Sequence, residues 1–109
     1  MSDLPRPYEQ FTQDHPDVWR AYEALGETAA KGGPLDLKTR ELIKLGMAAA
    51  NGSVSAVQSH VHRALEAGVK PAEIEHAILL GVTTLGFPAM MAALTWAKEA
   101  IEAHQAKDS

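Results

Sequence analysis

The sequence predicts an all-α fold of about five to six helices. Alanine is abundant and runs of β-branched residues are few, which favours helix over strand. Apolar residues recur at helical spacing, and short glycine- or proline-containing breaks separate these segments without forming a hairpin between alternating strands. A chain of 109 residues fits one domain, so residues 1–109 are predicted to form a single domain with its core in residues 37–101.

The first predicted helix runs from Pro16 to about Ala30 and follows an N-terminal extension of residues 1–15. Asp14 or His15 is expected to cap it, with proline in its first turn, and a Gly-Gly-Pro sequence ends it. Its apolar stripe is interpreted as part of the core and consists of Val18, Tyr22 and Leu25.

A second helix is predicted from Leu37 to about Ala50, capped by Asp36 and ended by Asn-Gly. From Leu42 onward it is almost entirely apolar, so it is expected to be a central helix with protein on most sides. A third helix, capped by Ser53, is predicted to end at Gly68. The last two are predicted at Pro71 to about Leu85, with a core stripe that includes Val82, and at Pro88 to His104, with a stripe that includes Met91.

Composition excludes several classes of partner and chemistry. The net charge of −4 gives no basic field for nucleic acid or anionic lipid. No stretch approaches the roughly 20 apolar residues of a membrane span, and MSDLPRPYEQ lacks the apolar centre of a signal peptide, so we expect a cytoplasmic protein. The absence of cysteine excludes disulfides, thiolate metal sites and thiol catalysis.

Candidate chemistry lies between Glu41 and His60 on two helices joined by one tight turn. Glu41 shares a helical face with Leu45 and Ala48, so its carboxylate borders apolar surface. A glutamate and a histidine in partly dry surroundings can exchange protons. Two structural interpretations compete with this one: a glutamate in a first helical turn favours the helix dipole, and a histidine among valine and alanine is often a hydrogen-bonded core residue.

No metal site and no cofactor are predicted. Although His60 and His62 form an HxH pair, residues two apart on a helix point in nearly opposite directions and cannot chelate one ion. His62 falls on a polar stripe with Glu66, where it is interpreted as a solvated or interface residue.

The segment ANGSVSAVQSHVHRALEAGVKPAEIEHAILLGVTTLGFPAMMAAL resembles the carboxymuconolactone decarboxylase family, which includes the AhpD-type peroxidases; the resemblance extends over about Leu37 to Ile101. It implies an AhpD-like helical bundle. In the AhpD branch a glutamate precedes a CxxCxxxH motif whose cysteines reduce peroxide. Here the motif falls on Glu41 and then Ser53-Val-Ser-Ala56-Val-Gln-Ser-His60, so the proton-relay positions are kept and both cysteines are replaced. Dithiol peroxidase chemistry is excluded.

The resemblance therefore implies a lyase-like, cofactor-independent acid/base enzyme on a small carboxylated or lactone-like molecule. Glu41 and His60 would be catalytic, and the substrate-binding positions would be Ser53, Ala56 and Arg63. The alternative is a catalytically silent oligomeric module that binds a small ligand. The family also implies a homotrimer, or a hexamer built from trimers. Independently, several apolar helix faces exceed what a 109-residue monomer can enclose, which predicts self-association.

Overall fold

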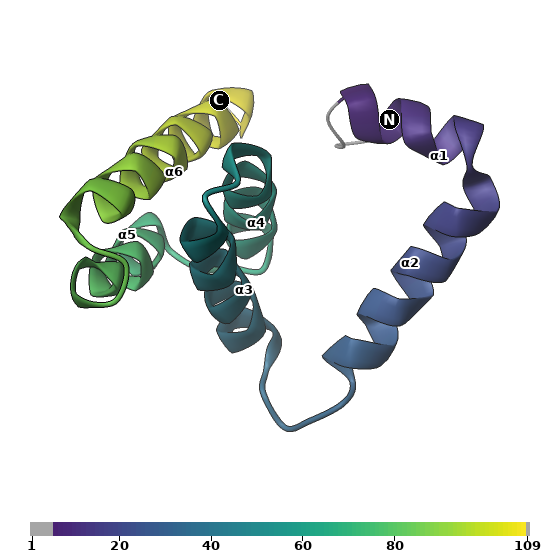
Figure 1. Cartoon of the computed structure of the whole chain (residues 1–109), viewed down its shortest axis with the longest axis horizontal. Coiled ribbons are helices and arrows are strands. Elements are labelled where there is room, and N and C mark those ends of the chain that lie inside the picture. The colour runs from purple at the N-terminus through teal and green to yellow at the C-terminus, as the bar shows by residue number, and fades with distance from the viewer. Residues whose placement is uncertain (1–5, 109) are drawn as a thin grey trace. The chain divides into compact units, whose positions relative to one another are not determined.

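A computed structural model describes residues 6–108; residues 1–5 of the predicted extension and Ser109 lie outside the described residues. Within 6–108 the regular structure is helical throughout, so the all-α prediction is confirmed (Figure 1). The elements are α1 (Arg6–Asp14), α2 (Pro16–Ala30), α3 (Leu37–Asn51), α4 (Val54–Glu66), α5 (Pro71–Leu79), the 3₁₀ helix η1 (Leu80–Thr83) and α6 (Phe87–Asp108). The chain divides into two compact units, residues 1–34 and 35–109, and the single-domain assignment stays a prediction.

The first unit contains a helix that the sequence analysis did not expect. α1 occupies most of the predicted extension, with Pro7 as its second residue. Proline is tolerated there because the first amides of a helix have no intrahelical acceptor. The Phe11 ring meets the Trp19 ring of α2 edge-on, with centroids 6.4 Å apart. An aromatic contact thus joins the two helices of this unit.

The predicted core stripe of α2 is wrong. Val18, Tyr22 and Leu25 are 57%, 64% and 67% exposed, and no residue of α2 is buried. The helix itself begins at Pro16 as predicted. Its helical spacing identified an apolar face, but a unit of two helices offers no second layer against which that face could be buried.

In the second unit, polar caps and one glycine determine where α3 and α4 begin and where α3 ends. The Asp36 side chain accepts a hydrogen bond from the Thr39 amide at 2.8 Å, which starts α3 as predicted. Gly52 ends it in the left-handed region, at φ 68°. Ser53 follows immediately, and its Oγ accepts from the Ala56 amide at 3.3 Å to start α4. α3 and α4 therefore form a tight hairpin and pack side by side.

The predicted fourth helix is shorter than expected. α5 ends at Leu79 and the chain continues as the tighter helix η1, after which the Leu85 amide donates to the Gly81 carbonyl. Gly81 and the β-branched residues after it favour the α-helix poorly, which accounts for the change. Val82 is 38% exposed rather than core. α6 begins at Phe87, extends past the predicted end at His104, and leaves Met91 40% exposed.

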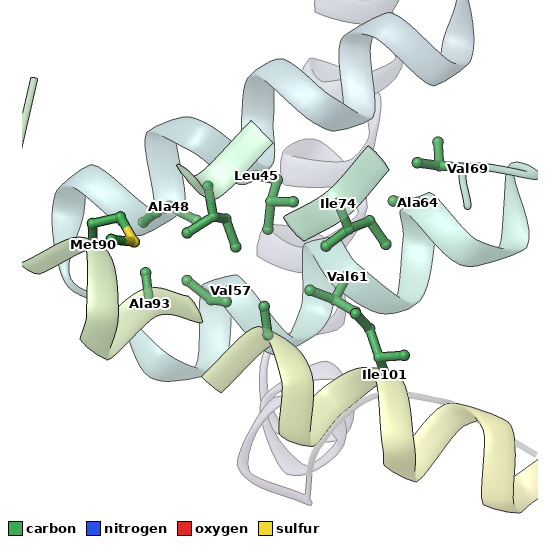
Figure 2. Packing of buried hydrophobic residues seen from close by; sticks show 13 residues of the cluster. Leu45, Ala48, Val57, Val61, Ala64, Val69, Ile74, Met90, Ala93 and Ile101 are labelled. Carbon is green, nitrogen blue, oxygen red and sulfur yellow. The ribbon is translucent and has the colours of Figure 1, made fainter. Parts of the chain in front are cut away.

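The core of the second unit consists of one buried stripe from each of its α-helices, together with Val69 from the loop between α4 and α5. α6 packs against α4 and α5, and α3 packs against α4 and α5. Figure 2 shows the side chains converging between the ribbons. The spacing along α4 and α6 is that of one helical face, which is why sequence periodicity located most of them. The buried apolar residues are Leu45, Ala48, Ala49, Val57, Val61, Ala64, Val69, Ile74, Ile78, Met90, Ala93, Ala97 and Ile101.

α3 is less enclosed than predicted. Its buried side carries Leu45 and the two alanines, whereas Ile43 and Met47 are 41% and 65% exposed. Within a single chain the expectation of protein on most sides of α3 is wrong. The unit leaves further large apolar side chains exposed: Leu37, Val54, Leu79, Leu80 and Phe87. No helix in residues 6–108 is long and apolar enough to cross a membrane.

Candidate active site

The hairpin brings Glu41 of α3 and His60 of α4 together. His60 Nδ1 lies 3.5 Å from Glu41 Oε2, and the two side chains are only 18% and 11% exposed. Both atoms are shielded from solvent and have no hydrogen-bond partner among the described residues. The predicted neighbours of Glu41 are confirmed, since Leu45 and Ala48 are buried on the same face. The pair is a contact at 3.5 Å in dry surroundings, and buried polar groups without a hydrogen-bond partner are few in native proteins, so each one calls for an explanation such as a catalytic role.

The surroundings of His60 favour its neutral form. Burial lowers the pKa of His60 below its ordinary value of 6.5, because the charged ring loses hydration. The Glu41 carboxylate opposes that shift, while the positive charges of Arg63 and Lys44 add to it. A neutral imidazole at pH 7 can accept a proton. Since Nδ1 is shielded and faces Glu41, Nε2 is the nitrogen through which His60 can act on a ligand.

His60 also lines an open pocket of about 570 Å³. The walls of the pocket are mainly apolar, and its polar lining residues are Lys44, Asn51 and His60. Glu41 is not among the lining residues. The remaining lining residues are Met47, Ala48, Ala50 and Ala56. An apolar cleft with a few polar groups is the usual form of a small-molecule site.

The three predicted substrate-binding residues occupy different environments. Ala56 lines the pocket. Ser53 is the N-cap of α4 and uses its oxygen on the Ala56 amide rather than on the pocket. Arg63 is exposed and lies one turn after His60 on α4. Its positive charge lowers the pKa of His60. Arg40, the other arginine near this hairpin, donates from Nη1 to the Leu35 carbonyl at 2.6 Å and so holds the chain before α3.

Sequence reasoning missed the contribution of α3 to the pocket wall. Lys44, Met47, Ala48 and Asn51 follow one another at spacings of three, one and three, which is one face of a helix. That spacing was a usable signal, but the face was interpreted as buried. Lys44 matters most, because it is the cationic side chain in the wall.

Comparison with known proteins identifies the family. The sequence profile of the carboxymuconolactone decarboxylase family matches residues 16–99, which is most of the chain. The chain belongs to the carboxymuconolactone decarboxylase family. The crystal structure of the apo form of a family protein from Legionella pneumophila superimposes with a TM-score of 0.78 at 26% identity, covering 90% of this chain and 87% of that one. This likeness confirms the fold predicted from the resemblance.

Two curated proteins are similar to this chain in sequence. An uncharacterized protein of Haemophilus influenzae is 36% identical over 63 residues, which are 58% of this chain and 56% of that protein. The chain thus spans little more than half of this relative's length. An uncharacterized protein of Methanocaldococcus jannaschii is 29% identical over 83 residues, covering 75% of this chain and 80% of that protein. The names of these two relatives specify no reaction, so the reaction has to be argued from the site.

Proposed function

We propose that this member of the carboxymuconolactone decarboxylase family is a cofactor-independent acid/base enzyme that acts on a small carboxylated or lactone-like molecule. The observation that carries the proposal is the shielded Glu41–His60 pair, 3.5 Å apart, next to a pocket that His60 lines. Dithiol peroxidase activity is excluded because the chain has no cysteine.

His60 is the proton-transfer group of the proposal and Glu41 is its positioning residue. A carboxylate that faces Nδ1 favours the tautomer with hydrogen on that nitrogen, which leaves the lone pair of Nε2 for the substrate. Glu41 also stabilises the imidazolium that forms when Nε2 takes a proton. The lowered pKa of His60 makes the imidazolium acidic enough to return that proton.

The pocket wall supports a carboxylated substrate. Lys44 supplies a positive charge and Asn51 a hydrogen-bonding amide beside the imidazole, while the methionine and alanine side chains contact an apolar skeleton. When a carboxylate leaves as CO₂, the electron pair of the broken C–C bond stays on the substrate, and that carbon then takes one proton. His60 is the proposed donor: its Nε2 takes a proton from solvent water and then gives that proton to the carbon.

The test is turnover of 4-carboxymuconolactone and a panel of carboxylated lactones, followed by CO₂ release and by loss of substrate. Turnover should fall at least about 100-fold in His60→Gln, which keeps a polar side chain but cannot carry the proton, consistent with the usual contribution of general acid–base catalysis. Glu41→Gln should lower kcat more than it raises KM, because it acts through the imidazole. His76→Gln, an exposed histidine on α5, is the matched control and should retain activity.

The alternative of a silent binding module makes a different prediction. A panel member that raises the melting temperature without being consumed would support binding alone, because any ligand of the native state stabilises it. Absence of turnover across the panel, or a His60→Gln enzyme as active as wild type, would contradict the acid/base proposal.

A further inference from the structure

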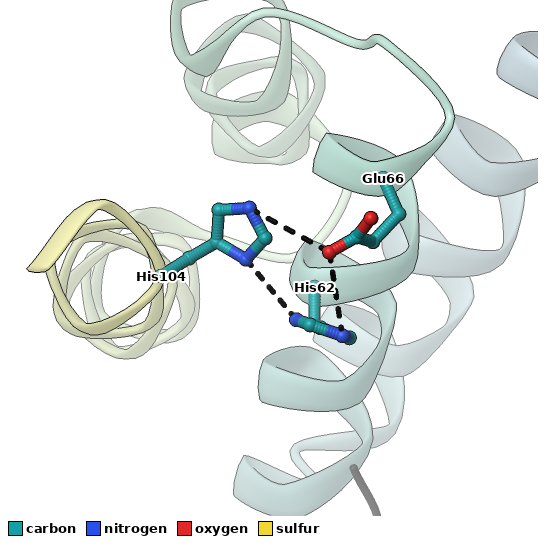
Figure 3. A network of polar contacts seen from close by, with 3 residues as sticks. All are labelled: His62, Glu66 and His104. Atoms are coloured by element: carbon teal, nitrogen blue, oxygen red, sulfur yellow. Dashed lines mark hydrogen bonds and ion pairs between the residues drawn. The ribbon is translucent and has the colours of Figure 1, made fainter. Parts of the chain in front are cut away.

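A second cluster of titratable groups lies apart from the Glu41–His60 pair, on another side of α4. His62 and Glu66 are one turn apart on α4, and His104 reaches them from α6, as Figure 3 shows. One ligand atom from each of the three residues lies within 4.8 Å of the others. Sequence reasoning separated His62 from His60 and found no chelating pair, but it had no means of placing His104 beside His62.

The two imidazoles are in direct contact. Nδ1 of His62 lies 3.1 Å from Nδ1 of His104, with the ring planes inclined by 64°. At that distance one nitrogen can donate a hydrogen and the other can accept it, and the tautomers decide which does so. The lone pair of a neutral imidazole nitrogen is the group that binds transition metals.

Glu66 completes a set of three ligands. Its Oε1 is 3.8 Å from Nε2 of His62 and 3.9 Å from Nε2 of His104. A tetrahedral zinc ion with bonds of 2.0–2.1 Å holds its ligand atoms about 3.3 Å apart. Binding an ion would therefore shorten the two pairs that include Oε1 by about 0.5–0.6 Å, and no two of the three ligand atoms lie more than 4.8 Å apart. The Glu66 side chain is 62% exposed and can make that adjustment by changing its rotamer.

The burial of the ligands indicates how an ion would be held. His104 is 12% exposed and His62 29%, so α4 and α6 fix the two rings, whereas Glu66 closes the site from the solvent side. Two nitrogens and one carboxylate suit zinc-class ions better than Mg²⁺ or Ca²⁺, which take oxygen ligands. Three protein ligands leave the fourth tetrahedral position to water or an anion.

We propose that His62, Glu66 and His104 form a binding site for a zinc-class divalent cation that links α4 to the C-terminal half of α6. Because the rings come from residues 42 positions apart, the ion would close a long loop of chain and stabilise the second unit. The alternative is a polar contact in which the two imidazoles and the carboxylate only hydrogen-bond and pair with one another. The two interpretations differ in whether the cluster takes up metal.

The experiment is equilibrium dialysis of chelator-treated protein against Zn²⁺ at pH 7.5, with metal quantified per chain. Wild type should bind one zinc per chain, and the affinity should fall at least about tenfold in His104→Gln and in Glu66→Gln. Glu66→Gln is the more secure variant because its side chain is mostly exposed and contributes little to the core. His76→Gln is the matched control, since it removes an exposed histidine elsewhere and should keep full zinc binding.

Co²⁺ provides a second readout that reports ligand identity. Visible d–d bands of a tetrahedral nitrogen–oxygen site should appear in wild type and in His60→Gln, and should be lost in His104→Gln. Zinc should also raise the melting temperature of wild type by several degrees and that of Glu66→Gln by less. The proposal is overturned if wild type binds no zinc, if Glu66→Gln and His104→Gln bind it like wild type, or if His60→Gln alone abolishes binding.

Discussion

Replacing both members of the Glu41–His60 pair with leucine should cost less stability than the sum of the two single replacements. The two atoms are 3.5 Å apart and almost fully shielded. If both groups were charged, an effective dielectric constant of 20 would give an attraction of about 5 kcal/mol, which is a ceiling. Because burial lowers the pKa of His60, the ring is neutral at pH 7.5, and the attraction is limited to at most that of a hydrogen bond to a charged acceptor, about 1.5–3 kcal/mol.

The 3.5 Å separation places the expected coupling near the lower end, at about 2 kcal/mol. Glu41→Leu leaves His60 Nδ1 buried with no carboxylate facing it, and His60→Leu leaves a buried carboxylate. Each variant should lower the free energy of unfolding by about 1–3 kcal/mol. The double variant buries two apolar side chains. Its free energy of unfolding should be about 2 kcal/mol higher than the value obtained by adding the two single effects. Buried pairs replaced by hydrophobic residues are often as stable as the original.

Urea unfolding followed by circular dichroism at pH 7.5 and one fixed protein concentration measures the three variants. The matched control is the same cycle on Glu75 and Lys98, an exposed pair 3.8 Å apart, for which a coupling below about 1 kcal/mol is expected. If the double variant at Glu41 and His60 shows the sum of the single effects within about 0.5 kcal/mol, the two groups do not interact and the site argument fails.

Three further predictions concern pH, thiol chemistry and assembly. The folded-state pKa of His60 lies below its ordinary value of 6.5, so near that pH the unfolded chain binds a proton that the folded chain does not. The free energy of unfolding should therefore fall as pH decreases through 6.5. In urea titrations His60→Leu should flatten this pH dependence, whereas the control His76→Gln should keep it. Ser53→Cys combined with Ala56→Cys should give a dithiol whose first thiol has a lowered pKa, because Ser53 Oγ already accepts a hydrogen bond from the amide of residue 56. The measurements are the rate of thiol alkylation by iodoacetamide and disulfide formation on oxidation. A rate equal to that of a free thiol, together with no intramolecular disulfide, would refute this prediction. The exposed apolar side chains, Met47, Leu80 and Phe87 among them, predict self-association, and the family resemblance implies that the assembly is a homotrimer or a hexamer. Light scattering coupled to gel filtration measures the assembly, and a stable species of about 11.7 kDa would contradict self-association.

The local features of the fold could be derived from the sequence because they depend on neighbouring residues. Asp36 and Ser53 cap their helices as predicted, and Gly52 turns the chain between them, since each acts on amides or dihedral angles within four residues. The proximity of Glu41 and His60 followed from that hairpin together with the family resemblance. α1 was not predicted because Pro7 lies in its first turn, and the sequence alone does not distinguish a proline in a first helical turn from a proline in a loop.

Burial and long-range contacts were decided only by the tertiary structure. Periodicity identifies an apolar face but not whether a partner covers it, which is why Tyr22 was assigned to the core and Met47 to an enclosed helix although both are more than 60% exposed. The contact between His62 and His104 spans 42 residues and depends on how α4 packs against α6. No local pattern records such a contact, because the free energy that brings the two helices together comes from the shared burial of residues such as Val61 and Ile101.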